Sequence, residues 1–283
     1  MDANELKALL TLMSDDDPEV VSIVKDRLES MSAQNLDALL NIAFEDGDSA
    51  VVNRLSVLMQ NHRVELTEFR LSRWIAEQSG NVLELLWIIA AFERPLLSIK
   101  TLNDVLVQLN YDIWLEMQHD LYPVEKIKKI DHLFWQKLGF KTYQYHKSNK
   151  VKPTSMLMVD EVMSCREGNY LIICMLYLLV GQRLNMPVSL VKLPSVFLFR
   201  YTFPDNIFYV HPFSRRMLFS RKELEGYAVQ MHKVPEEVIN EHFSGKELAT
   251  VLLKELRVAY QKEENEQDSK LVDKLISSLM WHR

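Results

Sequence analysis

The chain opens with a repeated pattern of apolar and polar positions. An apolar stretch from Leu6 leads to an acidic break and then to a second apolar stretch, and the same order recurs from Leu36, 30 positions later. Within each stretch the apolar residues follow the three-to-four-residue spacing of one helix face. A weaker third copy covers residues 71–92, with its break at Gly80 and Asn81. The pattern predicts pairs of amphipathic helices.

Prolines and acids mark helix boundaries within this pattern. Pro18 follows three aspartates, Asp15–Asp17, and both residue types favour the first turn of a helix. Pro95 interrupts the helical spacing, which resumes from Thr101. Helical pairs of this kind resemble HEAT-like repeats, in which each pair buries its apolar face only against a neighbour. We therefore predict a helical, HEAT-like region over residues 1–115, with an irregular helical bundle as the alternative.

Tryptophans also lie on these apolar helical stripes and on later ones. Large aromatic side chains on such stripes usually pack in a protein core. Burial is therefore predicted for Trp74, Trp87, Trp114 and Trp135.

Between Ser155 and Tyr227 the pattern changes from helical to mixed. A helix beginning near Gly168 is followed by three strand-like segments, at 188–193, 196–203 and 208–213. Beyond them, helix-like pieces alternate with a charged run. This change predicts a second domain over residues 116–228 and a helical tail over residues 229–283.

The composition is that of an ordinary globular protein, with 48% hydrophobic and 25% charged residues. The net charge of −6 argues against non-specific binding to nucleic acid, which requires a basic face. The longest apolar run, Leu171–Gly181, is too short to span a bilayer, and the N-terminal sequence lacks the basic segment of a secretion signal. We therefore predict a cytoplasmic protein that contacts neither nucleic acid nor membrane. No cofactor is predicted, and the spacing of the two cysteines is not that of a metal site.

Five short segments carry a resemblance to one family. In order they are HLFWQKLGF at His132–Phe140, EVMSCREG at Glu161–Gly168, the helix Leu171–Pro187, LPSVFLFR at Leu193–Arg200 and VHPF at Val210–Phe213. Together they resemble the transglutaminase-like core of the SirB-type bacterial proteins, over residues 115–228. The resemblance implies an α+β fold of the papain-like kind, in which helices pack against a small antiparallel sheet.

The resemblance also indicates where catalytic residues would lie. In an active enzyme of this layout, a Cys opens the central helix, a His lies on the next strand and an Asp on the one after. The matching positions here are Tyr170, Val196 and His211. An unperturbed phenol has a pKa of about 10, and a valine side chain transfers no proton. No catalytic residue is therefore expected at these three positions.

The two cysteines provide an alternative. Cys174 lies one turn further along the same helix among apolar neighbours, where a thiol usually behaves as a small hydrophobe. Cys165 precedes the helix beside Arg166 and is a candidate for an exposed thiol of lowered pKa. A relocated thiol at either position, served by His211, would make the chain a cysteine-dependent hydrolase or transferase.

The leading prediction is a pseudoenzyme that binds a protein or peptide, either through the former catalytic groove or through the helical surface. The candidate binding residues are Tyr170, Val196, His211, Arg166 and Arg200. For the two arginines, ion pairs with Glu161 or Asp160 are the alternative to binding an anionic ligand. The sequence identifies neither the partner nor the oligomeric state.

Overall fold

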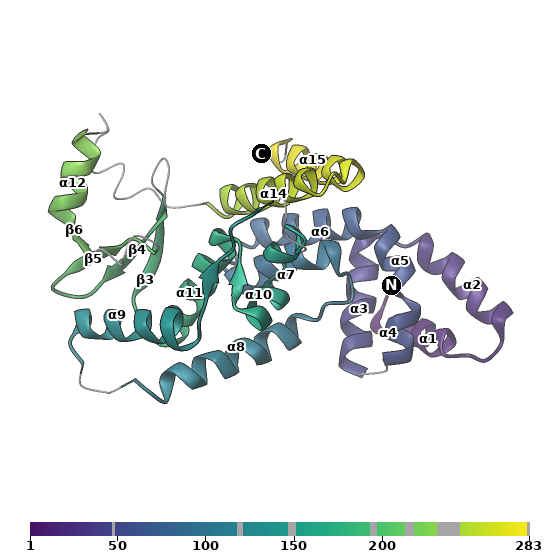
Figure 1. Ribbon diagram of the computed structural model, residues 1–283. Helices are drawn as coiled ribbons and strands as arrows, with labels where there is room; N and C mark the ends of the chain where they lie inside the picture. Colours follow the sequence, from purple (N-terminus) through teal and green to yellow (C-terminus); the bar gives the residue numbers. More distant parts are fainter. Residues whose placement is uncertain are drawn as a thin grey trace. The chain divides into compact units, whose positions relative to one another are not determined.

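The computed structural model of the chain describes residues 1–46, 49–117, 121–146, 151–192, 197–212, 218–230 and 244–281. The chain divides into two compact units (Figure 1). We call Met1–Leu102 together with Leu252–Arg283 the helical unit, and Asn103–Val251 the mixed unit. Helices predominate and accompany one small antiparallel sheet, which confirms the predicted α+β class. The domain boundaries predicted after residues 115 and 228 stay predictions.

The helical unit contains helices at all three predicted copies, but two short helices take the place of the second helix of the second copy. Its N-terminal helices are α1 (Ala3–Met13), α2 (Pro18–Glu29), α3 (Ala33–Asp46), α4 (Ser49–Arg54), α5 (Ser56–Asn61), α6 (Arg63–Ala76) and α7 (Val82–Glu93). Helix α1 packs against α2 and α3, α3 packs against α6, and α6 packs against α7. The first helices of the three pairs thus lie side by side. Helix α15 (Glu266–Trp281) also packs against α6, and most of α14 (Gly245–Lys262) belongs to the same unit.

Equivalent positions of the first two copies are buried. Leu6 and Leu36 are 3% and 0% exposed, and Leu10 and Leu40 are 6% and 0% exposed. These side chains belong to one apolar cluster of the unit. An amphipathic helix is stabilised mainly by burying its apolar face. The repeat read from the sequence therefore marks the packed faces of α1 and α3.

The predicted boundary residues lie at helix ends. Pro18 is the first residue of α2, and the Asp17 side chain caps the helix by accepting from the Glu19 backbone N–H at 2.9 Å. At the break of the third copy, the Asn81 side chain accepts from the Glu84 backbone N–H at 3.3 Å. Helix α7 ends at Glu93, before Pro95, and α8 (Ile99–Trp114) begins beyond it. Gly47, at the second break, lies outside the described residues.

The mixed unit contains the strands. Strands β3 (Val188–Lys192), β4 (Phe197–Thr202), β5 (Ile207–Val210) and β6 (Leu218–Ser220) form one antiparallel sheet in chain order. The first three fall on the three segments predicted as strands. Strand β6 was not predicted. Helix α12 (Arg221–Gln230) packs against β5 and β6, and α11 (Tyr170–Arg183) packs against β3.

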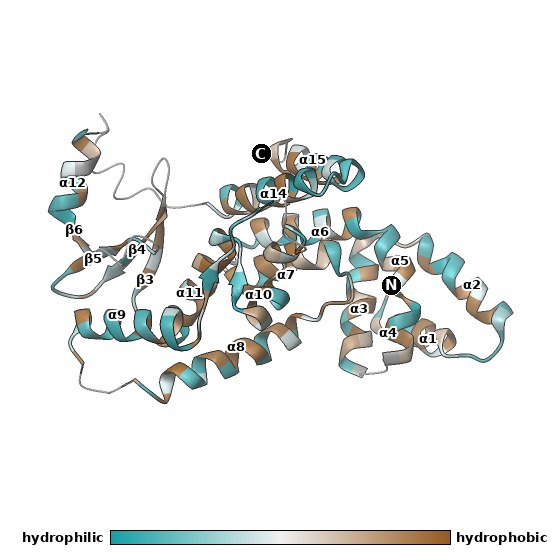
Figure 2. Cartoon of the chain, viewed as in Figure 1, coloured by the Kyte–Doolittle hydropathy of each residue, from teal (hydrophilic) through white to brown (hydrophobic). Residues whose placement is uncertain are grey.

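Helix α11 is the centre of the mixed unit. Every residue from Leu171 to Gly181 is buried. Figure 2 shows that α11 is largely hydrophobic. A helix that is apolar on all sides needs neighbours all around it. Its contacts include α10 (Val159–Cys165) and the parallel pair of β1 (Lys141–Thr142) and β2 (Glu167–Gly168). The remaining elements are α9 (Pro123–Asp131), the π-helical turn η1 (His132–Lys137) and the 3₁₀ turn η2 (Ser155–Leu157).

The tryptophans follow the prediction only in part. Trp74 and Trp87 are 2% and 4% exposed, as predicted. Trp135 is partly buried and stacks on Tyr177, with ring centroids 6.1 Å apart. For Trp114 the prediction was wrong, because 53% of this residue is exposed. Among the described helices none is both long enough and apolar enough to cross a membrane.

Candidate functional site

The candidate site is built around the first residue of α11. Gly168 in β2 lies so close to α10 that a Cβ atom there would be 2.6 Å from both Val162 methyl groups. A larger residue would push β2 away from α10. Asn169 follows, and its backbone N–H donates to the Met156 carbonyl at 2.7 Å. Its side chain caps α11 by accepting from the Leu171 backbone N–H at 2.8 Å. These contacts fix where α11 begins, at Tyr170.

Tyr170 packs against the beginning of the sheet. Its ring stacks on that of Phe197, the first residue of β4, with centroids 6.0 Å apart and planes 20° apart. His211 directly follows β5. Since Phe199 pairs with Val210, the start of β4 and the end of β5 lie at the same end of the sheet. Two of the three positions predicted from the resemblance therefore lie at one end of the sheet. Val196, the third, lies outside the described residues.

His211 has a perturbed acid–base equilibrium. The residue is partly exposed, and burial lowers the pKa of its imidazole below the ordinary value. A lowered pKa favours the neutral ring, which has one donor and one acceptor nitrogen. At neutral pH, His211 is thus equipped to exchange hydrogen bonds with a polar ligand.

The two thiols lie in different environments. Cys174 is 0% exposed inside α11, and burial strongly raises the pKa of its thiol. Cys165, the last residue of α10, is exposed, and its Sγ donates to the Glu167 carbonyl at 3.1 Å. Burial and a raised pKa favour the interpretation of Cys174 as a small hydrophobic core residue over that of a catalytic thiol. Of the two, only Cys165 is accessible to a solute.

Arg166 ends α10 in a left-handed backbone conformation, with φ at 63°. Its guanidinium lies over the Phe140 ring, 4.9 Å from the centroid. Partial burial lowers the pKa of this guanidinium, while the Asp112 carboxylate acts in the opposite direction. Its Nη1 is shielded from solvent and has no hydrogen-bond partner in the described part of the chain. The sequence reading considered Glu161 or Asp160 as its partner, but the aromatic contact with Phe140 was not foreseen.

Arg200, the other candidate arginine, lies in the middle of β4. It pairs with Ser189 of β3 on one side and with Tyr209 of β5 on the other. Among the described residues, neither its shielded Nε nor the Tyr209 hydroxyl has a hydrogen-bond partner. The pairing places Arg200 three residues into the strand from Phe197, away from the start of α11.

The sequence reading missed a buried polar network behind the site. The Tyr177 hydroxyl donates to the Asp131 carboxylate at 2.6 Å and lies 2.6 Å from the Tyr201 hydroxyl. Burial raises the pKa of both phenols, and the Asp131 charge adds to the effect. The network joins α9, α11 and β4, and so fixes the elements that carry Tyr170 and Phe197. No local pattern signals it, because Asp131 and Tyr177 are 46 residues apart.

A comparison with known families covers these elements. A sequence model described as the transglutaminase-like superfamily matches residues 100–257, more than half of the chain. The chain belongs to the transglutaminase-like superfamily. Comparisons with curated proteins and with solved structures gave no match.

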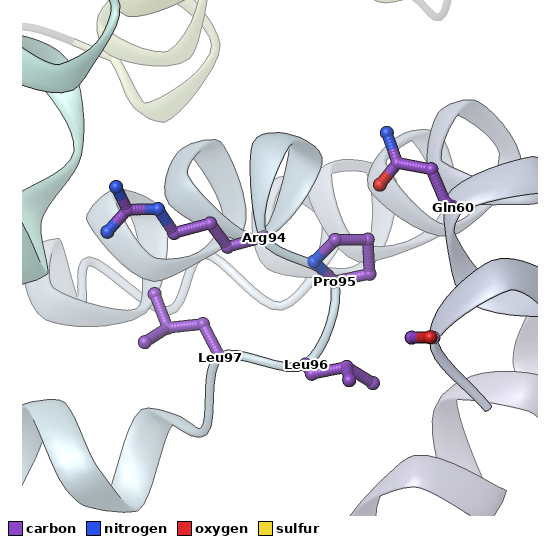
Figure 3. Close-up of a pocket in the computed structure, with 6 residues that line it drawn as sticks. Gln60, Arg94, Pro95, Leu96 and Leu97 are labelled. Carbon is purple, nitrogen blue, oxygen red and sulfur yellow. The ribbon is translucent and has the colours of Figure 1, made fainter. Parts of the chain in front are cut away.

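This transglutaminase-like chain also has a pocket in its helical unit. Its volume is about 370 Å³, and it is lined by Ser56, Gln60, Arg94, Pro95, Leu96 and Leu97. Figure 3 shows Pro95 between the Arg94 and Gln60 side chains, with Leu97 below Arg94 and Leu96 below Pro95. Apolar walls with polar groups at the ends suit an apolar side chain that carries a polar group.

Within the described ranges, no three His, Cys, Asp or Glu side chains are placed to hold a metal ion. At the start of α11 the described side chains offer groups that suit recognition. The exposed Tyr170 ring can stack on a partner. The His211 imidazole and the Arg166 guanidinium can exchange hydrogen bonds with it.

Proposed function

We propose that this chain is a non-catalytic, SirB-type member of the transglutaminase-like superfamily that binds a protein or peptide. The observation that carries the proposal is the Tyr170–Phe197 stack at the start of α11. A transglutaminase-type thiol would use this place because a helix N-terminus stabilises a thiolate. Here the place holds a phenol, which is not a nucleophile near neutral pH.

The same residues suit recognition. Tyr170 is 38% exposed although its ring is stacked, so one part of a large aromatic surface remains open to a partner. Tyrosine is enriched at protein interfaces because it offers apolar area together with a hydroxyl. His211 at the same end of the sheet adds hydrogen-bonding capacity. Arg166 adds a positive charge, which favours a peptide that carries a carboxylate. Val196, which lies outside the described residues, and Arg200, which lies further along β4, remain candidate contacts.

Peptide display tests this proposal without a known ligand. A phage library of random twelve-residue peptides is selected on the full chain, and recovered peptides are titrated against variants. We expect Tyr170→Asp to weaken binding at least about tenfold, as for a central aromatic contact. Tyr122→Asp is the matched control, because Tyr122 is another exposed tyrosine of the mixed unit, 76% exposed. Peptides that bind wild type and Tyr170→Asp equally would contradict a contact at this groove.

The helical surface is the other contact that the proposal allows. Gln60 is exposed and borders the pocket of the helical unit, so Gln60→Trp should obstruct the pocket without removing a buried group. Asn53→Trp, an exposed position of α4, is its control. If peptides bind Gln60→Trp more weakly than wild type but bind Asn53→Trp normally, the binding site is this pocket and not the groove.

A cysteine-dependent hydrolase or transferase is the second candidate, favoured by the exposure of Cys165. Iodoacetamide labelling of the folded protein, resolved by peptide and by pH, separates the two. For a binding protein we expect Cys165 to label slowly, and Cys174 only after unfolding. Fast labelling of either thiol below about pH 7 would instead indicate an activated nucleophile.

A further inference from the structure

Helix α8 carries two apolar faces. The inner face contains Leu102, Leu106, Leu109 and Ile113, which are all at most 2% exposed. The outer face contains Val107, Tyr111 and Trp114, which are 51%, 51% and 53% exposed, and it continues into Leu115, which directly follows the helix and is 58% exposed. The inner face explains why the helix folds onto its neighbours. The outer face has no such role, and we call these four residues the α8 stripe.

The α8 stripe is continuous and ordered. Its positions are four, seven and eight residues after Val107, which places them on one side of a helix. The Tyr111 and Trp114 rings stack on each other, with centroids 6.1 Å apart and planes 23° apart. Contiguous exposed apolar surface on a protein commonly marks an interaction site, and Trp and Tyr are the side chains that contribute most at such sites.

Val107 and Leu115 of the stripe lie symmetrically about Tyr111. Val107 lies four residues before Tyr111, and Leu115 lies four residues after it. If two copies of α8 pair antiparallel with Tyr111 on the two-fold axis, Val107 of each copy meets Leu115 of the other. A two-fold interface requires this self-complementarity, because the same patch must serve both subunits. The contacts on either side of Tyr111 would then join apolar side chains.

The charges at the ends of the stripe favour the same arrangement. Asp104, one turn before Val107, is exposed. At the other end, Glu116 pairs with both Lys129 and Lys137, so among these described residues two ammonium groups accompany one carboxylate. Antiparallel pairing brings Asp104 of each copy toward the lysines of the other. Parallel pairing would place Asp104 beside Asp104, which is unfavourable. Lys100 lies a further turn away, outside the paired segment.

We propose that the α8 stripe is a self-association surface, through which two copies of this chain pair α8 against α8 in antiparallel orientation about Tyr111. This surface is separate from the groove at the start of α11 and does not depend on the proposed function. Since a contact between two single helices is small, we expect a weak, concentration-dependent dimer.

Sedimentation equilibrium of the full chain tests the proposal. We expect a dimer that forms between about 1 µM and 1 mM, the range of weak specific association. Tyr111→Glu and, separately, Leu115→Lys should weaken it at least about tenfold, because each places a charge in the apolar contact. Both residues are exposed, so circular dichroism should show unchanged folding. The matched control is Val229→Glu on α12, where Val229 is 61% exposed; it should leave the dimer unchanged.

Disulfide cross-linking tests the orientation. In a Cys165→Ser background, Tyr111→Cys should cross-link to itself, because a residue on the axis faces its own copy within the reach of a disulfide. Val107→Cys and Leu115→Cys should cross-link when mixed, and neither should do so alone. A chain that stays monomeric up to about 1 mM would overturn the proposal. The α8 stripe would then be a binding surface for a different protein. A dimer that survives Tyr111→Glu, or self-linking of Val107→Cys, would overturn it equally.

Discussion

The helical unit and the mixed unit both bury polar side chains, but they balance them differently. In the helical unit, Arg70 is 1% exposed, and its Nε donates to the Asp37 carboxylate at 2.6 Å. In the mixed unit, the buried groups are the Tyr177 and Tyr201 hydroxyls together with Asp131. The first unit thus depends on compensating charges, and the second on hydroxyls that share one carboxylate. The cost of removing a partner should differ accordingly.

The charged cluster joins the second and third helical pairs. Asp37 in α3 also accepts from Arg73 at 3.1 Å, and the Arg70 guanidinium lies 4.4 Å from the centre of the Trp87 ring in α7. Burial lowers the pKa of Arg70, and the Asp37 charge opposes this effect. A buried charge is tolerable only while its counter-charge and hydrogen bonds are present. The cluster therefore fixes how α3, α6 and α7 pack.

The largest effect is expected from Asp37→Asn. This change leaves the Arg70 charge buried without its counter-charge, which should lower the free energy of unfolding by about 3–5 kcal/mol. Thermal and urea unfolding followed by circular dichroism measure the loss. The control is Glu266→Gln, which breaks an exposed pair with Lys270 and should cost less than about 1 kcal/mol.

A double replacement sharpens this test. Asp37→Leu combined with Arg70→Met removes both buried charges at once, so it should cost less than Asp37→Asn alone. If the double variant loses more free energy of unfolding than Asp37→Asn, the packing of the side chains matters more at this position than the balance of charge.

A smaller loss is expected from Tyr177→Phe in the mixed unit. The change removes the hydroxyl between Asp131 and Tyr201, and a buried polar group that loses a partner costs about 1–3 kcal/mol. Tyr122→Phe, at a tyrosine that is 76% exposed, should change the free energy of unfolding by no more than about 0.5 kcal/mol. If Tyr177→Phe cost as much as Asp37→Asn, the contrast between the two units would not hold.

The sequence predicted what depends on local spacing. The offset between Leu6 and Leu36 marked buried positions of the first two helical pairs, and Pro18 marked a helix start. Five ordered segments indicated the superfamily, and with it the helix that starts at Tyr170 and three strands. The first two signals are short-range preferences for helix, whereas the superfamily was indicated by the resemblance of the five segments.

The parts that the sequence did not predict depend on contacts across the chain. Asp37 and Arg70 are 33 residues apart and lie on different helices, so each looks like an ordinary solvated charge. Trp114 shows a related failure. Helix α8 has two apolar faces, and periodicity does not say which one turns inward. Only packing against the rest of the mixed unit decides that.

The smallest change in stability is expected at mildly acidic pH and should come from His211 in the mixed unit. Burial lowers the pKa of His211 in the folded chain, whereas an unfolded histidine has a pKa of about 6.5. Below that value the unfolded chain binds more protons than the folded chain, so stability falls as the pH decreases. The effect is absent above about pH 7 and is complete once the pH has passed below the folded pKa.

Because His211 is partly exposed, solvent keeps this loss small. We expect the melting temperature of His211→Gln to decline less between pH 7.5 and pH 5 than that of wild type, and proton NMR titration of the imidazole should show a folded pKa below about 6.5. A folded pKa above that value would reverse the sign, since the folded chain would then bind the extra proton and acid would stabilise it. The imidazole would in that case face a negative charge at the start of α11, and the groove would favour a basic ligand over an acidic one.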